Sequence, residues 1–183
     1  MKGSLDNRRA VHPSPQPDLI WIVGRKLAIG SRPGHLPDPH PQVVTGKKVV
    51  NEYVEALKKR GVENIICLLT EGEITKYYDF SLVDLYKTKG IKFSWSPMLA
   101  VPTIDSLCEI VSRAISESRT LVHCAGGTQR SGIVAACAVG RLGIRHSPQE
   151  AIELVTLKRG FNLHLTGEQV DLIRRYYASD LKG

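Results

Sequence analysis

The sequence has no apolar run long enough to cross a membrane, and its few cysteines follow no metal-binding pattern. Apolar stretches such as residues 65–69 are far shorter than the roughly 20 residues that a membrane helix needs. The four cysteines, at positions 67, 108, 124 and 137, form no CxxC pair and no zinc spacing. The first residues lack the apolar segment of a signal peptide. We therefore expect a protein of the reducing cytoplasm, with no membrane contact, no metal and no other cofactor.

The composition is that of a globular domain with a basic arm. Apolar residues make up 42% of the 183 residues and charged residues 23%. Residues 1–17 are polar, basic and rich in proline, which predicts a flexible arm before a single domain at 18–183. Lysine and arginine outnumber acidic residues by 25 to 18, a net charge of +7. This charge favours a phosphorylated protein or another polyanionic substrate and is compatible with nucleic acid, although a solvated basic surface explains it equally well. We expect a monomer.

Strand and helix patterns alternate along the chain, and we see no internal repeat. Runs typical of strands lie at residues 18–23, 26–29, 62–69, 91–95 and 120–123. Patterns and start signals typical of helices predict helical regions at 47–60, 70–89, from 103, 131–139, 147–158 and 166–177. Such alternation predicts an α/β fold, with a central, largely parallel sheet of four to five strands and helices on both faces.

One stretch of the chain joins three local patterns. Residues 120–123 are a short apolar run that ends in His123, as expected for a buried strand. Residues 124–130 form a glycine-containing loop, and residues 131–139 are small and apolar, as expected for a buried helix. This order puts the helix N-terminus at the loop, so that its free N–H groups point at whatever the loop encloses. The stretch therefore predicts an anion cradle with Cys124 at its entrance.

The residues of this loop suit nucleophilic attack on a phosphate. A thiolate is the nucleophilic form of cysteine, and a nearby cation or a helix N-terminus stabilises it. Arg130 supplies the cation and a planar fork for two phosphate oxygens, and the Ser131 hydroxyl can donate to the sulfur. The residues predicted to bind the phosphate are Ala125, Gly126, Gly127, Thr128, Gln129 and Arg130. We predict that Cys124 attacks phosphorus and that water hydrolyses the phosphocysteine; the alternative is a buried cysteine in an ordinary turn.

The segment from His123 to Ser131 reads His-Cys-Ala-Gly-Gly-Thr-Gln-Arg-Ser. It resembles the signature loop of the cysteine-dependent protein tyrosine phosphatase superfamily, in particular its dual-specificity members. The resemblance covers roughly residues 18–178 and implies the fold of that superfamily. It also implies catalytic roles for Cys124, Arg130 and Ser131, and a role for His123 in shaping the loop. The implied reaction is hydrolysis of phosphotyrosine, extended in dual-specificity members to phosphoserine and phosphothreonine.

The sequence departs from this family at the general acid. Relatives carry an aspartate in a Pro-Asp-x-x-Val-Pro-like pattern just before a helix. Here Pro97, Val101 and Pro102 frame the matching segment, but Met98 stands at the acid position and cannot donate a proton. The carboxylates that could replace it are Glu71, Glu73, Asp79 and Asp105. Each also has an ordinary interpretation: a capping box for Glu73, a first helical turn for Asp105, and solvated surface for the other two.

Two glutamines carry weaker signals. Gln169 matches a Thr-x-x-Gln segment of relatives in which a nearby glutamine orients the hydrolytic water, but its spacing from Thr166 is equally that of a capping box. Gln129 is larger than the glycine or alanine often found before the signature arginine. Polar residues at that position also occur in relatives that cleave phosphoanhydrides.

Three functional hypotheses remain open at this point. The first is a protein tyrosine or dual-specificity phosphatase. The second is an RNA 5′-triphosphatase or another phosphoanhydride phosphatase, suggested by the net charge, Gln129 and the methionine at position 98. The third is a pseudophosphatase that binds phosphate without turnover, against which the intact Cys124, Arg130 and Ser131 argue.

Overall fold

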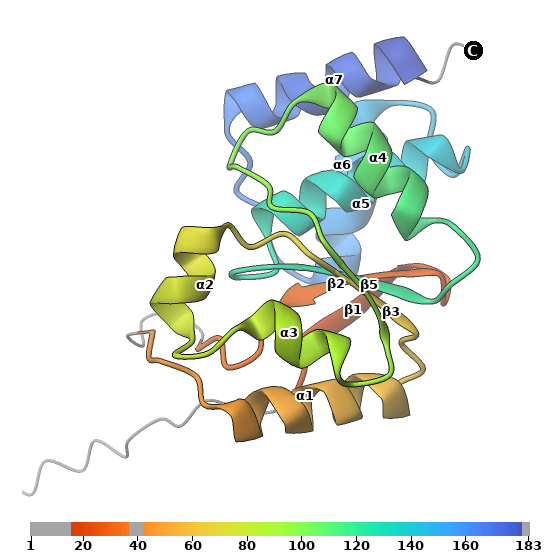
Figure 1. Ribbon diagram of the computed structural model, residues 1–183. Coiled ribbons are helices and arrows are strands. Elements are labelled where there is room, and N and C mark those ends of the chain that lie inside the picture. The colour runs from red at the N-terminus through yellow and green to blue at the C-terminus, as the bar shows by residue number, and fades with distance from the viewer. Residues whose placement is uncertain (1–15, 37–41, 181–183) are drawn as a thin grey trace, which may run out of the picture.

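A five-stranded sheet lies at the centre of the computed structural model, which describes residues 16–36 and 42–180 (Figure 1). The strands are β1 (Leu19–Val23), β2 (Leu27–Ser31), β3 (Asn64–Cys67), β4 (Lys92–Trp95) and β5 (Thr120–Cys124). Their order is β1-β2-β5-β3-β4; β1 is antiparallel to β2, and all other neighbours are parallel. The predicted sheet is confirmed. Residues 1–15 of the predicted arm lie outside the described residues, so the arm and the domain boundary stay predictions.

Helices cover both faces of the sheet, as predicted (Figure 1). They are α1 (Lys47–Lys59), α2 (Glu71–Tyr77), α3 (Leu82–Lys87), α4 (Ile104–Ala114), α5 (Gln129–Arg141), α6 (Pro148–Arg159) and α7 (Gly167–Asp180). The helices α1, α2 and α3 pack on one face, and α4, α5, α6 and α7 pack on the other. Each face buries its own apolar cluster, so the sheet is enclosed from both sides.

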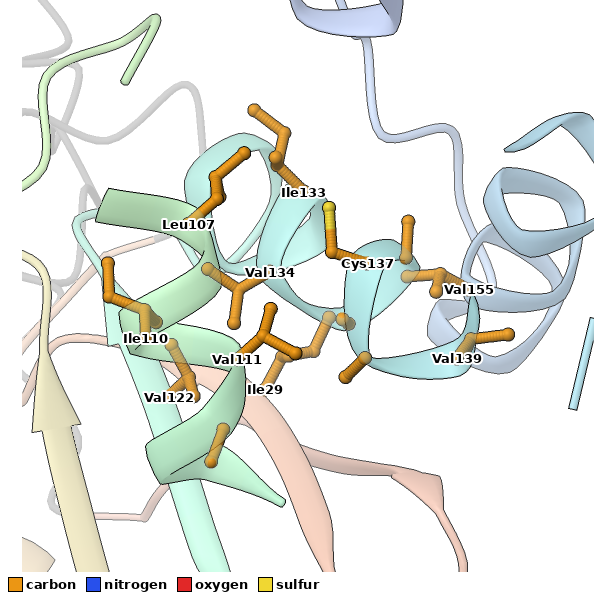
Figure 2. Packing of buried hydrophobic residues seen from close by; sticks show 14 of the residues in the cluster. Ile29, Leu107, Ile110, Val111, Val122, Ile133, Val134, Cys137, Val139 and Val155 are labelled. Carbon is orange, nitrogen blue, oxygen red and sulfur yellow. The ribbon is translucent and has the colours of Figure 1, made fainter. Parts of the chain in front are cut away.

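The helix α5 is the most deeply buried helix of the fold. Residues 131–140 are all buried. Figure 2 shows side chains of α4 and α5 meeting above those of β2 and β5, with Val134 among them. The helix can be enclosed because it is made of small apolar residues, which let neighbouring elements approach closely. Its position is thereby fixed relative to the strand that precedes it.

The helical region predicted at residues 70–89 is two helices rather than one. Tyr78 has an extended backbone, which ends α2, and its buried hydroxyl donates to the Pro33 carbonyl at 3.0 Å. Ser81 then caps a second helix by accepting a hydrogen bond from the Asp84 N–H. The anchoring of Tyr78 against a distant segment is a tertiary contact that the local pattern did not reveal.

The other helix start signals are confirmed. The Thr103 side chain accepts from the Ser106 N–H, and the Ser147 side chain accepts from the Glu150 N–H. Thr70 forms the predicted reciprocal capping box at the start of α2. Such caps fix where a helix begins because they satisfy N–H groups that have no partner inside the helix.

The cysteines at positions 67, 124 and 137 are buried, whereas Cys108 is partly exposed. Within residues 16–36 and 42–180, no helix is both long and apolar enough to span a membrane. In the same part of the chain, no group of three or more histidine, cysteine, aspartate or glutamate side chains could hold a metal ion.

We predict that Gly140→Ala destabilises the protein by about 1–3 kcal/mol, as overpacking of a core does. A Cβ at Gly140 would lie 2.4 Å from Cζ of Tyr177, the α7 residue whose hydroxyl donates to the Ala136 carbonyl. Gly167→Ala is the matched control, because its Cβ would meet nothing within 4 Å. Urea unfolding measures both, and an equal effect of the two substitutions would contradict this account of the α5–α7 contact.

Candidate functional site

The carboxyl ends of three parallel strands bring the predicted cradle together. Ser31 at the end of β2 pairs with Cys124 at the end of β5, and Cys67 at the end of β3 pairs with His123. The chain leaves β5 at Cys124 and enters α5 at Gln129, so that the helix N-terminus follows the loop directly. The strand, loop and helix predicted from the sequence are confirmed. Such an edge, with a helix N-terminus beside it, is a favourable place for an anion.

Cys124 and Ser131 contact each other across the loop. The Sγ atom lies 3.5 Å from the Ser131 Oγ atom, and Cys124 is only 3% exposed. The Ser131 hydroxyl is fully buried. It can donate to the sulfur, and a hydrogen bond to a thiolate favours the charged form.

Gly127 allows the loop to lie directly on β2. Its φ is +69°, and a Cβ there would lie 2.4 Å from the Gly30 carbonyl carbon and 2.5 Å from the Ser31 nitrogen. Only glycine fits such a position. The loop is also held by the Arg32 N–H, which donates to the Ala125 carbonyl at 3.2 Å. Gly126 is partly buried, and its carbonyl accepts from the Thr128 hydroxyl at 3.4 Å.

Arg130 forms an ion pair with Glu73, a contact that the sequence did not predict. Its Nη1 donates to Glu73 Oε2 at 2.8 Å and its Nη2 to Glu73 Oε1 at 2.5 Å. Nη1 also donates to the carbonyls of Leu68 at 3.2 Å and Met98 at 3.1 Å. These four hydrogen bonds involve Nη1 and Nη2, and none of them involves Nε–H. These contacts fix the direction of the guanidinium.

The ion pair with Arg130 also decides the charge of Glu73. Burial raises the pKa of Glu73, but hydrogen bonds from Arg130 and from Thr70 outweigh it and leave that pKa lowered. Glu73 is therefore ionised at neutral pH and is unsuited to donate a proton there. The capping box with Thr70 is confirmed, with the Thr70 N–H donating to Oε2 at 2.9 Å. Because the capping box already explained Glu73, nothing in the sequence pointed to Arg130 as its second partner.

His123 lies beneath the loop as a neutral, buried ring. Its Nδ1 is 3.5 Å from the Cys124 carbonyl, and its Nε2 is 3.3 Å from the Tyr86 hydroxyl. A carbonyl can only accept, so Nδ1 carries the proton and Nε2 accepts from Tyr86. Burial is the largest cause that lowers the pKa of His123, to about 4. The ring therefore joins the loop to α3 without carrying charge at neutral pH.

The two glutamines singled out in the sequence each donate a hydrogen bond to a distant backbone carbonyl. Gln129 donates through Nε2 to the His164 carbonyl at 2.8 Å. Gln169 forms the predicted reciprocal capping pair with Thr166 and donates through Nε2 to the Ala100 carbonyl at 2.8 Å. The Gln169 side chain is buried in these contacts. A role for it in orienting water stays a prediction.

The candidate proton donors are spread over different environments. Met98 is 2% exposed, and its side chain belongs to the apolar cluster with α4 and α5, so an acid at this position would be buried in the core. Glu71, Asp79 and Asp105 are exposed, on α2, in the turn after it and in the first turn of α4. The structure brings none of these three into a hydrogen bond with the loop among the described residues. The identity of a proton donor stays open.

We predict that His123 makes the stability fall at acid pH. The imidazole titrates near 6.5 in the unfolded chain and near 4 in the folded one, so between these values the unfolded chain binds more protons. The free energy of unfolding should therefore fall as the pH drops below about 6.5, with a loss of about 2 kcal/mol by pH 5 from this residue alone.

Urea unfolding of the native protein and of His123→Gln, at pH 7 and pH 5, measures this contribution. Carboxylates affect both proteins alike, so the pH dependence should be weaker in His123→Gln by the stated amount. His146→Gln, at an exposed histidine, is the matched control and should leave the pH dependence unchanged. The same pH dependence in all three proteins would contradict the assignment.

The fold is shared with solved phosphatase structures. A structure of kinase-associated phosphatase (KAP), with its catalytic-site cysteine replaced by serine, has a TM-score of 0.72 and 27% identity, covering 92% of this chain and 96% of that one. The structure of Tk-PTP in its active form has a TM-score of 0.67 and 22% identity, covering 89% and 98%. The second likeness is one of fold alone.

Sequence comparison identifies the family of the chain. The human protein named cyclin-dependent kinase inhibitor 3 is 33% identical over 136 residues, which is 71% of this chain and 64% of that protein. The match therefore spans less than two thirds of this relative. The model of the family described as cyclin-dependent kinase inhibitor 3 (CDKN3) matches residues 32–152, a range that contains the signature loop, Glu73 and Met98. On this match over more than half of its length, the chain belongs to the cyclin-dependent kinase inhibitor 3 (CDKN3) family.

Proposed function

We propose that this chain is a cysteine-dependent phosphatase that hydrolyses phosphotyrosine, together with phosphoserine or phosphothreonine, in phosphorylated proteins. The observation that carries the proposal is the position of the Cys124 sulfur. It lies at the end of β5 before the N-terminus of α5, with the Ser131 hydroxyl at 3.5 Å. Membership of the CDKN3 family and the likeness to kinase-associated phosphatase support the same reaction and a phosphoprotein substrate.

In the first step the Cys124 thiolate attacks phosphorus. A new S–P bond forms while the bond between phosphorus and the substrate oxygen breaks, and the leaving oxygen takes the electron pair. We expect Arg130 to offer its phosphate fork through Nε–H and the second N–H of Nη2, because Glu73 and two carbonyls hold Nη1 and the other N–H of Nη2. The amides of residues 125–130 add fixed dipoles, so charge that develops on the phosphoryl oxygens is stabilised without reorganisation.

In the second step water attacks the phosphocysteine. The S–P bond breaks, inorganic phosphate leaves, and the electron pair returns to sulfur. The Ser131 hydroxyl can donate to the departing thiolate at the distance seen here. This chemistry needs a reduced cysteine, and Cys124 is a free thiol, which supports a cytoplasmic location. We also propose that the chain acts as a monomer.

A second candidate function is hydrolysis of a phosphoanhydride, such as an RNA 5′-triphosphate. The observation that favours it is the burial of Met98, which leaves the usual acid position without a proton donor. A diphosphate leaves without protonation more readily than an alkoxide does. A pseudophosphatase that only binds phosphate is the remaining alternative, and turnover of any phosphate ester would exclude it.

We predict that Cys124→Ser lowers the turnover of an aryl phosphate by roughly 10³-fold or more. Phosphate binding should persist because the loop amides and Arg130 remain. Arg130→Lys should also be severe, since a point charge cannot replace the planar fork. Phosphate release is the measurement, and Cys108→Ser, at a partly exposed cysteine on α4, is the control. Appreciable turnover by clean Cys124→Ser protein would exclude the mechanism.

We predict that the rate depends steeply on the leaving group. A general acid contributes about 10²- to 10⁴-fold, and it matters most for strongly basic leaving oxygens. Without one at residue 98, anhydrides and activated aryl phosphates should react fastest, phosphotyrosine more slowly, and phosphoserine and phosphothreonine slowest. The alkaline limb of the pH–rate profile should be weak.

The measurement is kcat/KM over a panel of RNA triphosphate, aryl phosphates and matched phosphopeptides. Leaving-group basicity alone favours RNA triphosphate. A higher kcat/KM for phosphopeptides than for RNA triphosphate would therefore favour the first function over the second. If the rate did not depend on leaving-group basicity and the alkaline limb were clear, a proton donor would be present. Glu71→Gln, Asp79→Asn and Asp105→Asn, one at a time, would then identify it.

A further inference from the structure

Arg32 is a fully buried arginine beside the predicted cradle. It follows the last residue of β2, and that residue, Ser31, pairs with Cys124. Its N–H donates to the Ala125 carbonyl at 3.2 Å, so its backbone touches the loop itself. Only 1% of the residue is exposed.

The partners of the Arg32 guanidinium within residues 16–36 and 42–180 are all neutral. Nη1 donates to the Pro33 carbonyl at 3.0 Å and to the Thr45 hydroxyl at 3.2 Å, and Nη2 donates to Gln42 Oε1 at 2.8 Å. The Tyr77 ring covers it, with Cζ 3.8 Å from the ring centroid. Across residues 16–36 and 42–180, no carboxylate lies within 4.0 Å of its nitrogens, and its buried Nε has no hydrogen-bond partner. Among the described residues its charge therefore has no carboxylate partner.

The hydrogen bonds of Arg32 do not explain why a charge is buried here. The Pro33 carbonyl also accepts from the Tyr78 hydroxyl at 3.0 Å, and Gln42 Oε1 also accepts from the Leu36 N–H at 3.2 Å. These two acceptors would keep a donor without Arg32. Burial of an unpaired charge costs free energy, and an apolar side chain of similar shape is often equally or more stable in its place. Stability alone therefore gives no reason to keep the arginine.

The charge balance around the loop gives such a reason. The charge of Arg130 is matched by Glu73, so this pair adds little net positive charge for an incoming dianion. Arg32 adds one that is not matched. After burial and the charge of Arg130, the charge of Arg32 is among the causes that lower the pKa of His123, the residue next to Cys124. A fixed buried charge acts through a low dielectric and is little screened by salt.

We propose that Arg32 is an electrostatic positioning residue, whose unneutralised charge draws the substrate phosphate into the loop at the expense of fold stability. It does not touch the phosphate; it acts through the field of its guanidinium, whereas the Ala125 carbonyl is held by its backbone N–H. The inference rests on the proposed phosphatase function. Its test uses the binding of inorganic phosphate, which is measured without turnover, so the two can fail separately.

The experiment compares Arg32→Met, which keeps the unbranched stem without the charge, with Arg32→Lys, which keeps the charge without the fork. We expect Arg32→Met to weaken phosphate binding by about tenfold, and to raise KM for an aryl phosphate more than it lowers kcat. Arg32→Lys should stay within about threefold of the native protein. The free energy of unfolding of Arg32→Met should equal or exceed the native value.

Arg141→Met is the matched control, because it changes the net charge equally at the exposed far end of α5, about 20 Å from the loop by helix length. It should bind phosphate as the native protein does. Native phosphate affinity in Arg32→Met would overturn the proposal. So would an Arg32→Met protein that unfolds readily or does not fold, since Arg32 would then be a structural residue. Equal loss of binding in Arg32→Met and Arg32→Lys would also overturn it, by showing that charge is not what matters.

Discussion

The position of the Cys124 sulfur depends on the complete burial of α5. A helix enclosed from both sides cannot shift, so the loop at its N-terminus is fixed against the strand that leads into it. Gly127 completes the constraint, because its missing side chain lets the loop rest on the backbone of Gly30 and Ser31. At the other end, Gly140 gives room to the Tyr177 ring of α7. Close approach to backbone at Gly127 and to a tyrosine ring at Gly140 therefore holds the helix at both ends.

The two arginines beside the loop differ in whether a carboxylate pairs with their charge. Arg130 has a carboxylate partner, which fixes its direction but also cancels its charge. Among the described residues Arg32 has no carboxylate partner, and its guanidinium lies against a tyrosine ring and neutral acceptors. Both are connected to α2: Glu73 lies on that helix, and Tyr77 at its end covers Arg32. The sequence predicted α2 and α3 as one helix. In the structure α2 contacts both arginines, because Glu73 orients Arg130 and Tyr77 covers Arg32.

What the sequence predicted well was local. The strand, loop and helix around Cys124 were predicted because glycine content, apolar runs and helix signals are properties of neighbouring residues. The sheet and its two covered faces followed from the alternation of strands and helices. The contact between Glu73 and Arg130 joins residues 57 positions apart, and nothing in either segment points to the other. The split of residues 70–89 was missed for a similar reason, because Tyr78 ends the helix by reaching Pro33.

The segment around Met98 carries the general acid in relatives. In this chain its backbone helps to orient Arg130. Its backbone is fixed at Met98, whose N–H donates to the Leu68 carbonyl at 3.1 Å and whose carbonyl accepts from Arg130. It is fixed again at Ala100, whose carbonyl accepts from Gln169. A loop that swings to deliver an acid must break such contacts, whereas this one orients Arg130 only while it keeps them. We therefore expect a site built in this way to lower the barrier through fixed charge and dipoles, with protonation of the leaving oxygen left to solvent or to the substrate.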